Sequence, residues 1–199
     1  VHTAGGHTGR FIRDLLDREG VPGQPVPVAE PTRESFMVYE ETTGQQYRFG
    51  MPGPTLREEE WSRIIDVLSV LEPRPDYLVG SGALSPGAPV DFYARLARAG
   101  KTLGARVVVD TSGDALRHAV REPVYLVKPN YREFIDLVGR EPRDESEQEA
   151  LSLAFLRQSD CEAILLSLGA AGMLLATREG TQRLRAPGGP VRSKVGAGD

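Results

Sequence analysis

Short apolar runs alternate along this chain with segments of helical periodicity, and this alternation limits the fold more than any other feature. A strand, a helix and a second strand in one sheet form a unit whose strands are parallel. The pattern therefore predicts an α/β fold with a doubly wound, mainly parallel sheet flanked by helices. The strand-like runs lie at 77–79, 107–109, 124–127 and 164–166, and the helical segments at 89–99, 115–120, 132–138 and 146–157.

The segment 34–50 departs from this alternation. Apolar side chains there alternate with polar ones on both sides of a Thr43-Gly44 pair, which favours a tight turn. The pattern predicts an antiparallel β-hairpin. Its alternating residues are Phe36, Val38, Tyr47 and Phe49.

Two further segments, 8–18 and 56–71, carry apolar residues at helical spacing, so each predicts a helix with one apolar face. We expect both faces to lie in the core. The first face carries Phe11, Ile12, Leu15 and Leu16, and the second carries Trp61, Ile64, Ile65, Leu68 and Leu71.

Charge and cysteine content narrow the function classes. The chain has 24 Lys and Arg against 28 Asp and Glu, a net charge of −4, and no basic cluster, so we expect no nucleic-acid partner. No apolar run approaches the length that spans a bilayer, so we expect no membrane partner. The single cysteine, Cys161, cannot form an internal disulfide, which favours the cytoplasm, and its place beside a strand favours a buried, inert thiol.

Two short motifs that suggest nucleotide binding fail on their spacing. Gly100-Lys101-Thr102 copies the end of a P-loop, but Arg95 stands where an earlier glycine is required. We interpret Gly100 as the residue that closes a helix. The glycines of the segment 4–9 lack the spacing of the dinucleotide fingerprint, which disfavours a dehydrogenase.

The run Gly196-Ala197-Gly198-Asp199 indicates an anion site. Small residues let backbone N–H groups crowd around an anion, and the Asp199 carboxylate stands beside it. The same residue types occur in ordinary turns, so this interpretation needs support from other segments.

Two segments that follow predicted strands supply that support. Asn130 and Glu133 follow the run 124–127, which places them near the carboxyl edge of the sheet, where open α/β sheets bind ligands. The alternative is a plain capping box with Asn130 as the N-cap. Residues 165–173 predict two strands joined by a glycine-rich turn, with Ser167 and the turn amides free to meet a ligand.

In this order and at these separations, the three segments resemble the PfkB branch of the ribokinase-like sugar kinases. The likeness covers essentially the whole chain, and the pattern is most similar to the subgroup of 6-phosphofructokinases, 1-phosphofructokinases and tagatose-6-phosphate kinases. The further segments that carry it are HTAGGHTG (2–9), Thr32-Arg33, YRF (47–49), MPG (51–53), DYLVGSGALSPG (76–87) and VVVDTSG (107–113).

The resemblance implies a fold, the extent of the domain and an oligomeric state. We expect a single ribokinase-like α/β domain over 1–199, incomplete at both ends, in which 34–50 forms a small β lid. We expect a homodimer through that lid in the complete protein. Residues 1–199 alone should be inactive.

The resemblance also implies a role for each candidate residue, with ATP and Mg²⁺ as cofactors. Asp199 would take the proton from a sugar hydroxyl, and the amides of Gly196, Ala197 and Gly198 would form the anion hole. The residues implied at the metal are Asn130, Glu133 and Asp110. Those implied at the nucleotide are Lys128, Asn130, Ser167, Gly169 and Gly172, and those at the sugar phosphate are Arg33, Arg48, Ser81 and Gly82.

The implied activity is ATP-dependent phosphorylation of a ketohexose phosphate, with fructose 6-phosphate giving fructose 1,6-bisphosphate as the first candidate. Ala83 stands where the family's fructose 6-phosphate enzymes carry a serine, and Lys194 replaces a usual Thr or Ser. Fructose 1-phosphate, tagatose 6-phosphate and an unphosphorylated sugar or nucleoside therefore stay open as substrates. A non-catalytic homologue that binds sugar phosphate or nucleotide is the alternative from another class.

Overall fold

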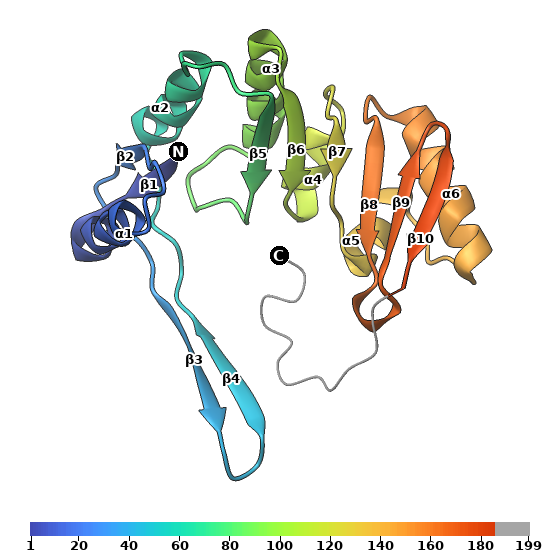
Figure 1. The fold of residues 1–199 in the computed structure, drawn as a ribbon, viewed down its shortest axis with the longest axis horizontal. Coiled ribbons are helices and arrows are strands. Elements are labelled where there is room, and N and C mark those ends of the chain that lie inside the picture. The colour runs from blue at the N-terminus through green and yellow to red at the C-terminus, as the bar shows by residue number, and fades with distance from the viewer. Residues whose placement is uncertain (186–199) are drawn as a thin grey trace. The chain divides into compact units, whose positions relative to one another are not determined.

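The computed structural model describes residues 1–185 (Figure 1). Contacts between residues divide the chain into two compact units. The first unit comprises Val1–Val70 with Ser85–Pro89, and the second comprises the other described residues.

A six-stranded sheet forms the centre of the second unit, in the order β10-β9-β8-β7-β6-β5. The four strands from β5 to β8 are parallel, and β9 and β10 add an antiparallel edge. The predicted mainly parallel sheet is therefore confirmed. The strands are β5 (Tyr77–Ser81), β6 (Arg106–Asp110), β7 (Leu126–Val127), β8 (Ala163–Ser167), β9 (Met173–Thr177) and β10 (Gly180–Leu184).

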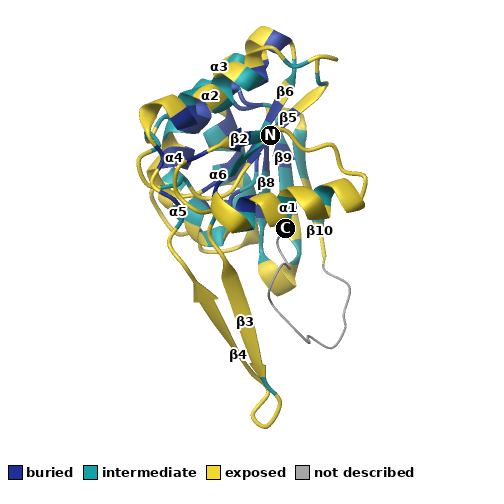
Figure 2. Cartoon of the chain, turned by 90° about the vertical axis from the view of Figure 1, so that its left-hand side faces the viewer, coloured by how far each residue is buried: buried dark blue, intermediate teal, exposed yellow. Residues whose placement is uncertain are grey.

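Four helices of the second unit cover one face of this sheet (Figures 1 and 2). Strand residues alternate between buried and more exposed, as Tyr77–Ser81 does, because successive side chains of a strand point to opposite faces. Val107, Val109 and Leu166 lie in the resulting core. The helices are α3 (Phe92–Leu103), α4 (Gly113–Ala119), α5 (Tyr131–Val138) and α6 (Glu145–Gln158), each close to its predicted segment.

Gly100 does not close a helix, so this part of the sequence prediction is wrong. Helix α3 continues to Leu103 and ends at Gly104, whose φ of 78° is left-handed. Gly100 lies buried inside α3, where a Cβ atom would come 2.3 Å from Cγ2 of Val107. The missing side chain lets α3 pack closely on β6, and this non-local reason is invisible in a local motif.

The first unit contains two small sheets and two helices. β1 (His2–Ala4) pairs in parallel with β2 (Pro25–Pro27), and α1 (Gly6–Arg18) lies between them in sequence. β3 (Ser35–Glu40) and β4 (Gln45–Gly50) form the expected antiparallel hairpin, whose turn includes Gly44 with a φ of 70°. Almost all of this hairpin is exposed (Figure 2). The last helix of the unit is α2 (Glu58–Ser69).

The apolar face of α1 is not in the core, contrary to the sequence prediction. Phe11 and Leu15 are 52% and 41% exposed. The buried residue of α1 is Gly9, where a Cβ atom would lie 2.8 Å from the carbonyl carbon of Ala4. Helix α1 therefore approaches β1 through a glycine. In α2, by contrast, Trp61 and Leu68 are buried as predicted.

Cys161 is a buried thiol, as predicted. Burial raises its pKa to about 11, so the thiolate form is disfavoured at neutral pH. None of the helices in residues 1–185 is long and apolar enough to cross a membrane.

A carboxylate at the start of α6 holds the loop that precedes this helix. Glu147, whose side chain is 10% exposed, accepts hydrogen bonds from the Arg143 amide at 2.7 Å, from Arg143 Nε at 3.0 Å and from Arg140 Nη1 at 2.5 Å. These bonds, with those of Arg143 first, lower the pKa of Glu147 to about 2 from its ordinary value of 4.5. A lowered carboxylate pKa stabilises the fold at any pH above the ordinary value, and this stabilisation is lost as the pH falls toward the lowered one.

We predict that Glu147→Gln lowers the urea midpoint at neutral pH, because the two arginines lose a charged acceptor. The difference from the parent protein should shrink as the pH falls from about 4.5 toward about 2. Urea unfolding across this range measures it. Glu179→Gln is the matched control, since Glu179 makes no side-chain contact of this kind with a described residue. A midpoint difference that stays constant with pH contradicts the assignment.

Candidate active site

Polar side chains gather where four parallel strands of the second unit end. In the register of the sheet, Ser81 at the end of β5 lies opposite Asp110 at the end of β6. Asn130, just after β7, forms a bridge with Ser167 at the end of β8. The structure thus brings together, along one carboxyl edge, candidate residues from four adjacent strands. Open α/β sheets bind their ligands at this edge.

Asp110 and Lys128 form an ion pair at this edge. Lys128 Nζ lies 3.1 Å from Asp110 Oδ2, and the two side chains are 25% and 29% exposed, so solvent still reaches them. The Lys128 amide donates to the carbonyl of Val109 at 3.0 Å, which fixes the start of this side chain beside β6. The pair offers an ammonium group for phosphate oxygens and a carboxylate for a hydrated cation.

The turn after β5 is held by side chains that the sequence analysis missed. The carbonyl of Gly82 accepts hydrogen bonds from the Tyr93 hydroxyl at 2.6 Å and the Thr111 hydroxyl at 2.8 Å, and its amide donates to the carbonyl of Asp110 at 2.9 Å. The φ of Gly82 is 111°, a conformation that favours glycine. Burial raises the pKa of Tyr93, which keeps its hydroxyl protonated as a donor. No sequence spacing links these residues.

The capping box at the start of α5 is present. Asn130 Oδ1 accepts from the amides of Arg132 at 2.9 Å and Glu133 at 3.0 Å, and Glu133 Oε2 accepts from the Asn130 amide at 2.8 Å. Both side chains are therefore held by backbone groups. Asn130 Oδ1 uses both of its lone pairs in these bonds, whereas Glu133 Oε2 keeps a further one and Glu133 Oε1 accepts no hydrogen bond from a described residue. The capping box, which the sequence left open as an alternative, is therefore present. It does not exclude a second role of this segment in ligand binding.

The donor set at this edge fits a hydrated Mg²⁺ rather than a closed protein cage. No group of three or more His, Cys, Asp and Glu residues in the described chain could hold a metal ion. The carboxylates of Glu133 and Asp110 supply oxygen donors, while Asn130 Oδ1 is already bound by two amides. Mg²⁺ keeps several waters when it binds with phosphates, so few protein donors are needed.

The turn after β8 is less open than predicted. The amides of Leu168, Ala171 and Gly172 donate within the turn, so the expectation that the turn amides are free is wrong for these three. The Ser167 hydroxyl donates to the carbonyl of Pro129 at 3.4 Å and keeps its lone pairs as acceptors. A Cβ atom at Gly169 would meet nothing within 4 Å, so open space borders this residue.

Arg33 and Arg48 belong to the first unit. Arg33 is exposed in a segment that the glycine-rich start of the chain holds: Thr32 Oγ1 accepts from the Gly5 amide at 3.0 Å. A Cβ atom at Gly5 would lie 1.9 Å from the carbonyl oxygen of Glu30, so only glycine admits this approach. Arg48 is exposed on β4, opposite Met37.

A buried carboxylate fastens the same part of the first unit and was also missed. Glu60 accepts from the amides of Ala29 at 2.6 Å and Arg57 at 2.8 Å. These two bonds, with that of Arg57 first, lower the pKa of Glu60. The Glu60 carboxylate thus joins the start of α2 to the strand end that precedes Arg33.

The predicted anion hole and base lie outside the described residues, and their roles stay predictions. These residues are Gly196, Ala197, Gly198 and Asp199, with Lys194.

Comparison with known proteins gives one family. The profile of the pfkB family carbohydrate kinases matches residues 2–199. The chain is 39% identical over 196 residues to the ATP-dependent 6-phosphofructokinase isozyme 2 of Mycobacterium tuberculosis and 34% identical over 200 residues to that of Escherichia coli. It is 30% identical over 195 residues to the 1-phosphofructokinase of Bacillus subtilis. These matches cover 98% to 100% of this chain and 58% to 64% of each relative.

The fold is similar to that of solved structures from the same group. The phosphofructokinase-2 from Escherichia coli in complex with fructose 6-phosphate matches with a TM-score of 0.89 at 34% identity, over 98% of this chain and 64% of that one. The tetrameric inhibited form of the same enzyme matches with a TM-score of 0.91, over the same shares of the two chains. The present chain thus spans about three fifths of the length of these relatives.

The capping role of Asn130 can be separated from any ligand role. We predict that Asn130→Ala destabilises the fold by about 0.5 to 2 kcal/mol, because two amides at the start of α5 lose their acceptor. Asn130→Asp keeps the acceptor and should cost much less. Urea unfolding of the two variants measures the change in stability. Asp144→Ala, which removes the N-cap side chain of α6, shows how much the loss of a cap costs in this protein. Equal destabilisation by both Asn130 variants contradicts it.

Proposed function

This chain belongs to the pfkB family of carbohydrate kinases, and we propose that the protein transfers the γ-phosphoryl group of ATP to a hydroxyl of a ketohexose phosphate. The observation that carries this proposal is the set of polar residues on four adjacent parallel strands, with the Asp110–Lys128 ion pair among them. Phosphoryl transfer needs such positioning and charge compensation more than covalent chemistry.

Fructose 6-phosphate is the first candidate substrate. The two most similar relatives compared above are named 6-phosphofructokinase, and a more distant one is named 1-phosphofructokinase. Because Ala83 removes a hydroxyl from the expected sugar-phosphate loop, fructose 1-phosphate and tagatose 6-phosphate stay as alternatives. An unphosphorylated sugar or nucleoside would offer no phosphate group for Arg33 and Arg48 to bind.

The proposed nucleotide site lies at the carboxyl edge of the second unit's sheet. Lys128 would neutralise phosphate oxygens, and Ser167 with the turn at Gly169 and Gly172 would face the nucleotide. Mg²⁺, when bound, would balance the charge on the phosphates. Asn130, Glu133 and Asp110 would hold its water ligands in place.

The proposed chemistry completes the site with residues outside the described part of the chain. Asp199 would accept the proton of the attacking hydroxyl as its oxygen bonds to the γ-phosphorus and the bond to the β-phosphate oxygen breaks, leaving ADP. The amides of Gly196, Ala197 and Gly198 would stabilise the charge on the transferring group. Ser81 and Gly82 would position the sugar.

Arg33 and Arg48 are proposed to bind the substrate's phosphate. Neither guanidinium forms an ion pair or hydrogen bond with another residue in 1–185, so each is available to an anion. Arg33 is the stronger candidate, because Thr32 ties its segment to Gly5. A planar guanidinium suits two phosphate oxygens at once.

We further propose that two copies assemble through the β3–β4 hairpin. Phe36, Val38, Tyr47 and Phe49 occupy one face of the hairpin and are each between 44% and 57% exposed, an unusual concentration for a surface hairpin. The Phe36 and Phe49 rings stack with centroids 4.9 Å apart and present one apolar patch. A second hairpin of the same kind would cover it.

We predict that Arg33→Ala, in the full-length protein, raises the KM for the sugar phosphate about thirtyfold, equivalent to about 2 kcal/mol. The KM for ATP should change little. Steady-state kinetics with fructose 6-phosphate, fructose 1-phosphate and tagatose 6-phosphate measures the effect and selects the substrate. Asp199→Asn, expected to reduce turnover about a hundredfold or more, gives the background rate.

Arg13→Ala is the matched control for this variant. Arg13 is an exposed arginine of α1 that makes no ion pair with a described residue, and its loss should leave each KM unchanged. If the Arg33 variant behaves like the Arg13 variant with every sugar phosphate, the phosphate-binding role is wrong. If the protein phosphorylates only unphosphorylated sugars, the proposed class of substrate, a ketohexose phosphate, is wrong.

For the assembly, we predict that the double variant Phe36→Ser and Phe49→Ser converts a dimer to a monomer. The two rings are exposed within one copy, so the fold of that copy should persist. Light scattering after size exclusion gives the mass, and circular dichroism checks the fold. Val70→Ser, which alters an exposed apolar residue outside the hairpin, should keep the dimer. A dimer in all three proteins rules out this interface.

A further inference from the structure

A cavity of about 250 Å³ lies between α6 and the turn that joins β9 to β10. Four residues line it: Leu153, Leu156, Arg157 and Arg178. Leu156 is 1% exposed and forms part of the core, whereas both arginines are exposed. The hollow therefore has an apolar floor and a cationic mouth.

This cavity is separate from the candidate active site. Thr177, just before the turn, pairs with Ala163 at the first position of β8. The candidate active site begins at Ser167, the last position of the same strand. Arg178 thus lies at the amino edge of the parallel strands, opposite the edge proposed for phosphoryl transfer.

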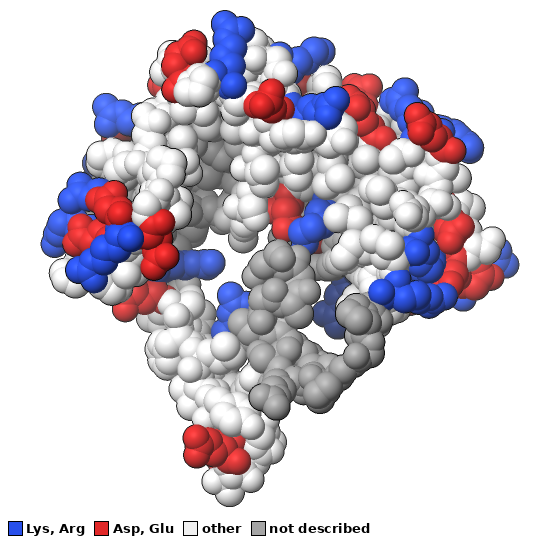
Figure 3. Space-filling view, in the orientation of Figure 1, with Lys and Arg blue, Asp and Glu red and all other residues white. Residues whose placement is uncertain are grey.

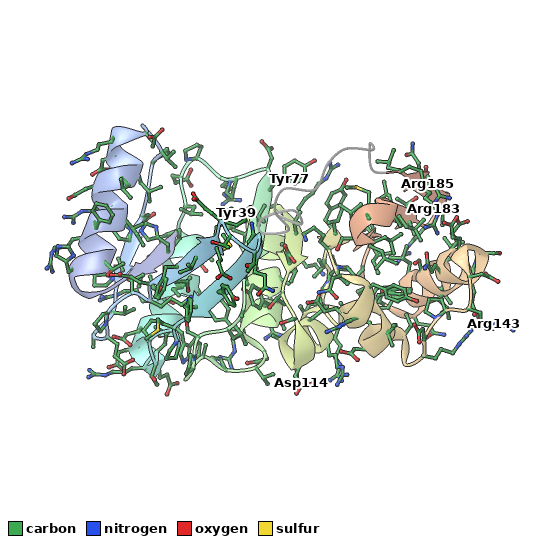
Figure 4. All side chains as sticks on the ribbon, turned by 90° about the horizontal axis from the view of Figure 1, so that it is seen from below. Tyr39, Tyr77, Asp114, Arg143, Arg183 and Arg185 are labelled. Atoms are coloured by element: carbon green, nitrogen blue, oxygen red, sulfur yellow. The ribbon has the colours of Figure 1, made fainter. Side chains whose placement is uncertain are left out.

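The two arginines of the cavity differ from the other arginines around α6. Arg183 and Arg185 on the β10 side (Figure 4) form ion pairs with Glu145, and Arg143 (Figure 4) pairs with Glu147. Side chains of opposite sign also adjoin one another on the face of the second unit seen in Figure 3. Arg157 and Arg178, in contrast, form no ion pair or hydrogen bond with another residue in 1–185.

Two guanidinium groups at the mouth of one hollow raise the positive potential there, which favours an anion. The four described residues that line the cavity include no carboxylate, so none of them compensates the two positive charges. A guanidinium is a rigid fork of donors that matches the oxygens of a carboxylate or phosphate. The mouth of the cavity is therefore suited to a bound oxyanion.

The apolar floor of the cavity restricts the chemistry of the part of the ligand that lies beyond the oxyanion. A bare inorganic ion would leave the partly exposed Leu153 side chain against water, whereas an apolar group would cover it. The volume corresponds to about eight water molecules of liquid, which admits only a small organic group. We propose that this cavity binds a small amphiphilic anion, an oxyanion head on a short apolar body.

The test uses the full-length protein with side-chain Nε–Hε signals of its arginines followed by NMR. Hexanoate and butyl phosphate are the amphiphilic probes, and acetate and inorganic phosphate are their counterparts without an apolar body. We expect saturable shifts of the Arg157 and Arg178 signals. Each amphiphilic probe should bind about tenfold more tightly than its counterpart, since buried methylene groups add affinity. Whichever of hexanoate and butyl phosphate binds more tightly shows whether the site prefers a carboxylate or a phosphate head group.

Three variants of the lining residues and one control variant make the assignment specific. Arg157→Gln and Arg178→Gln should each weaken hexanoate binding about tenfold or more, because each removes a charged donor. Leu153→Gln should weaken the amphiphilic probes and spare inorganic phosphate. Arg121→Gln, at an exposed arginine just after α4 without a described partner, should change nothing.

The proposal fails on any of three outcomes. Absence of saturable shifts at Arg157 and Arg178 removes the site. Equal affinity for acetate and hexanoate removes the role of the floor. An equal loss in Arg121→Gln shows general attraction of anions to arginine. Because the signals report these two residues directly, the result does not depend on kinase activity.

Discussion

Parallel pairing of β5 through β8 determines where chemistry can occur in the second unit. Strands that run in the same direction end at the same edge, so the backbone alone brings a residue at or just past the end of each strand beside its neighbours. Asp110, Lys128, Asn130 and Ser167 meet in this way. The backbone register is set by the apolar face that α3 to α6 cover, and a slip of one residue would turn that face to solvent. Core packing and site geometry are thus one constraint.

The residues at that edge serve the fold and the proposed chemistry together. Asn130 and Glu133 complete the first turn of α5, and Gly82 holds its strained turn through Tyr93 and Thr111. A side chain fixed by backbone groups loses little further freedom when a ligand binds, which favours affinity. The same arrangement means that a loss of activity in a variant of Asn130 has two possible origins. Stability must therefore be measured beside turnover.

The sequence predicted what depends on local pattern and missed what depends on distant contacts. Apolar patterning located α2, α3 and the four parallel strands of the large sheet, because burial of one face imposes the pattern on the sequence. The role of Gly100 depends on Val107 across the α3–β6 contact, and the bonds of Glu60 depend on Ala29. Neither pair has a characteristic spacing. The exposure of Phe11 was missed for a related reason, since an amphipathic period identifies a helix but not what covers it.

Strand β8 joins the two sites proposed here, and its length limits how they can affect each other. Four steps along a strand span about 13 Å, which exceeds the distance over which exposed charges interact strongly at physiological salt. An anion at Arg157 and Arg178 would therefore have little direct electrostatic effect on phosphates near Ser167. Any coupling would have to pass through the packing of Ile164 and Leu166, which are fully buried in β8. Close-packed residues of this kind shift together or not at all. Coupling between the sites would therefore require a second arrangement of β8 that one ligand prefers, since affinity at one site can respond to the other only through such a difference.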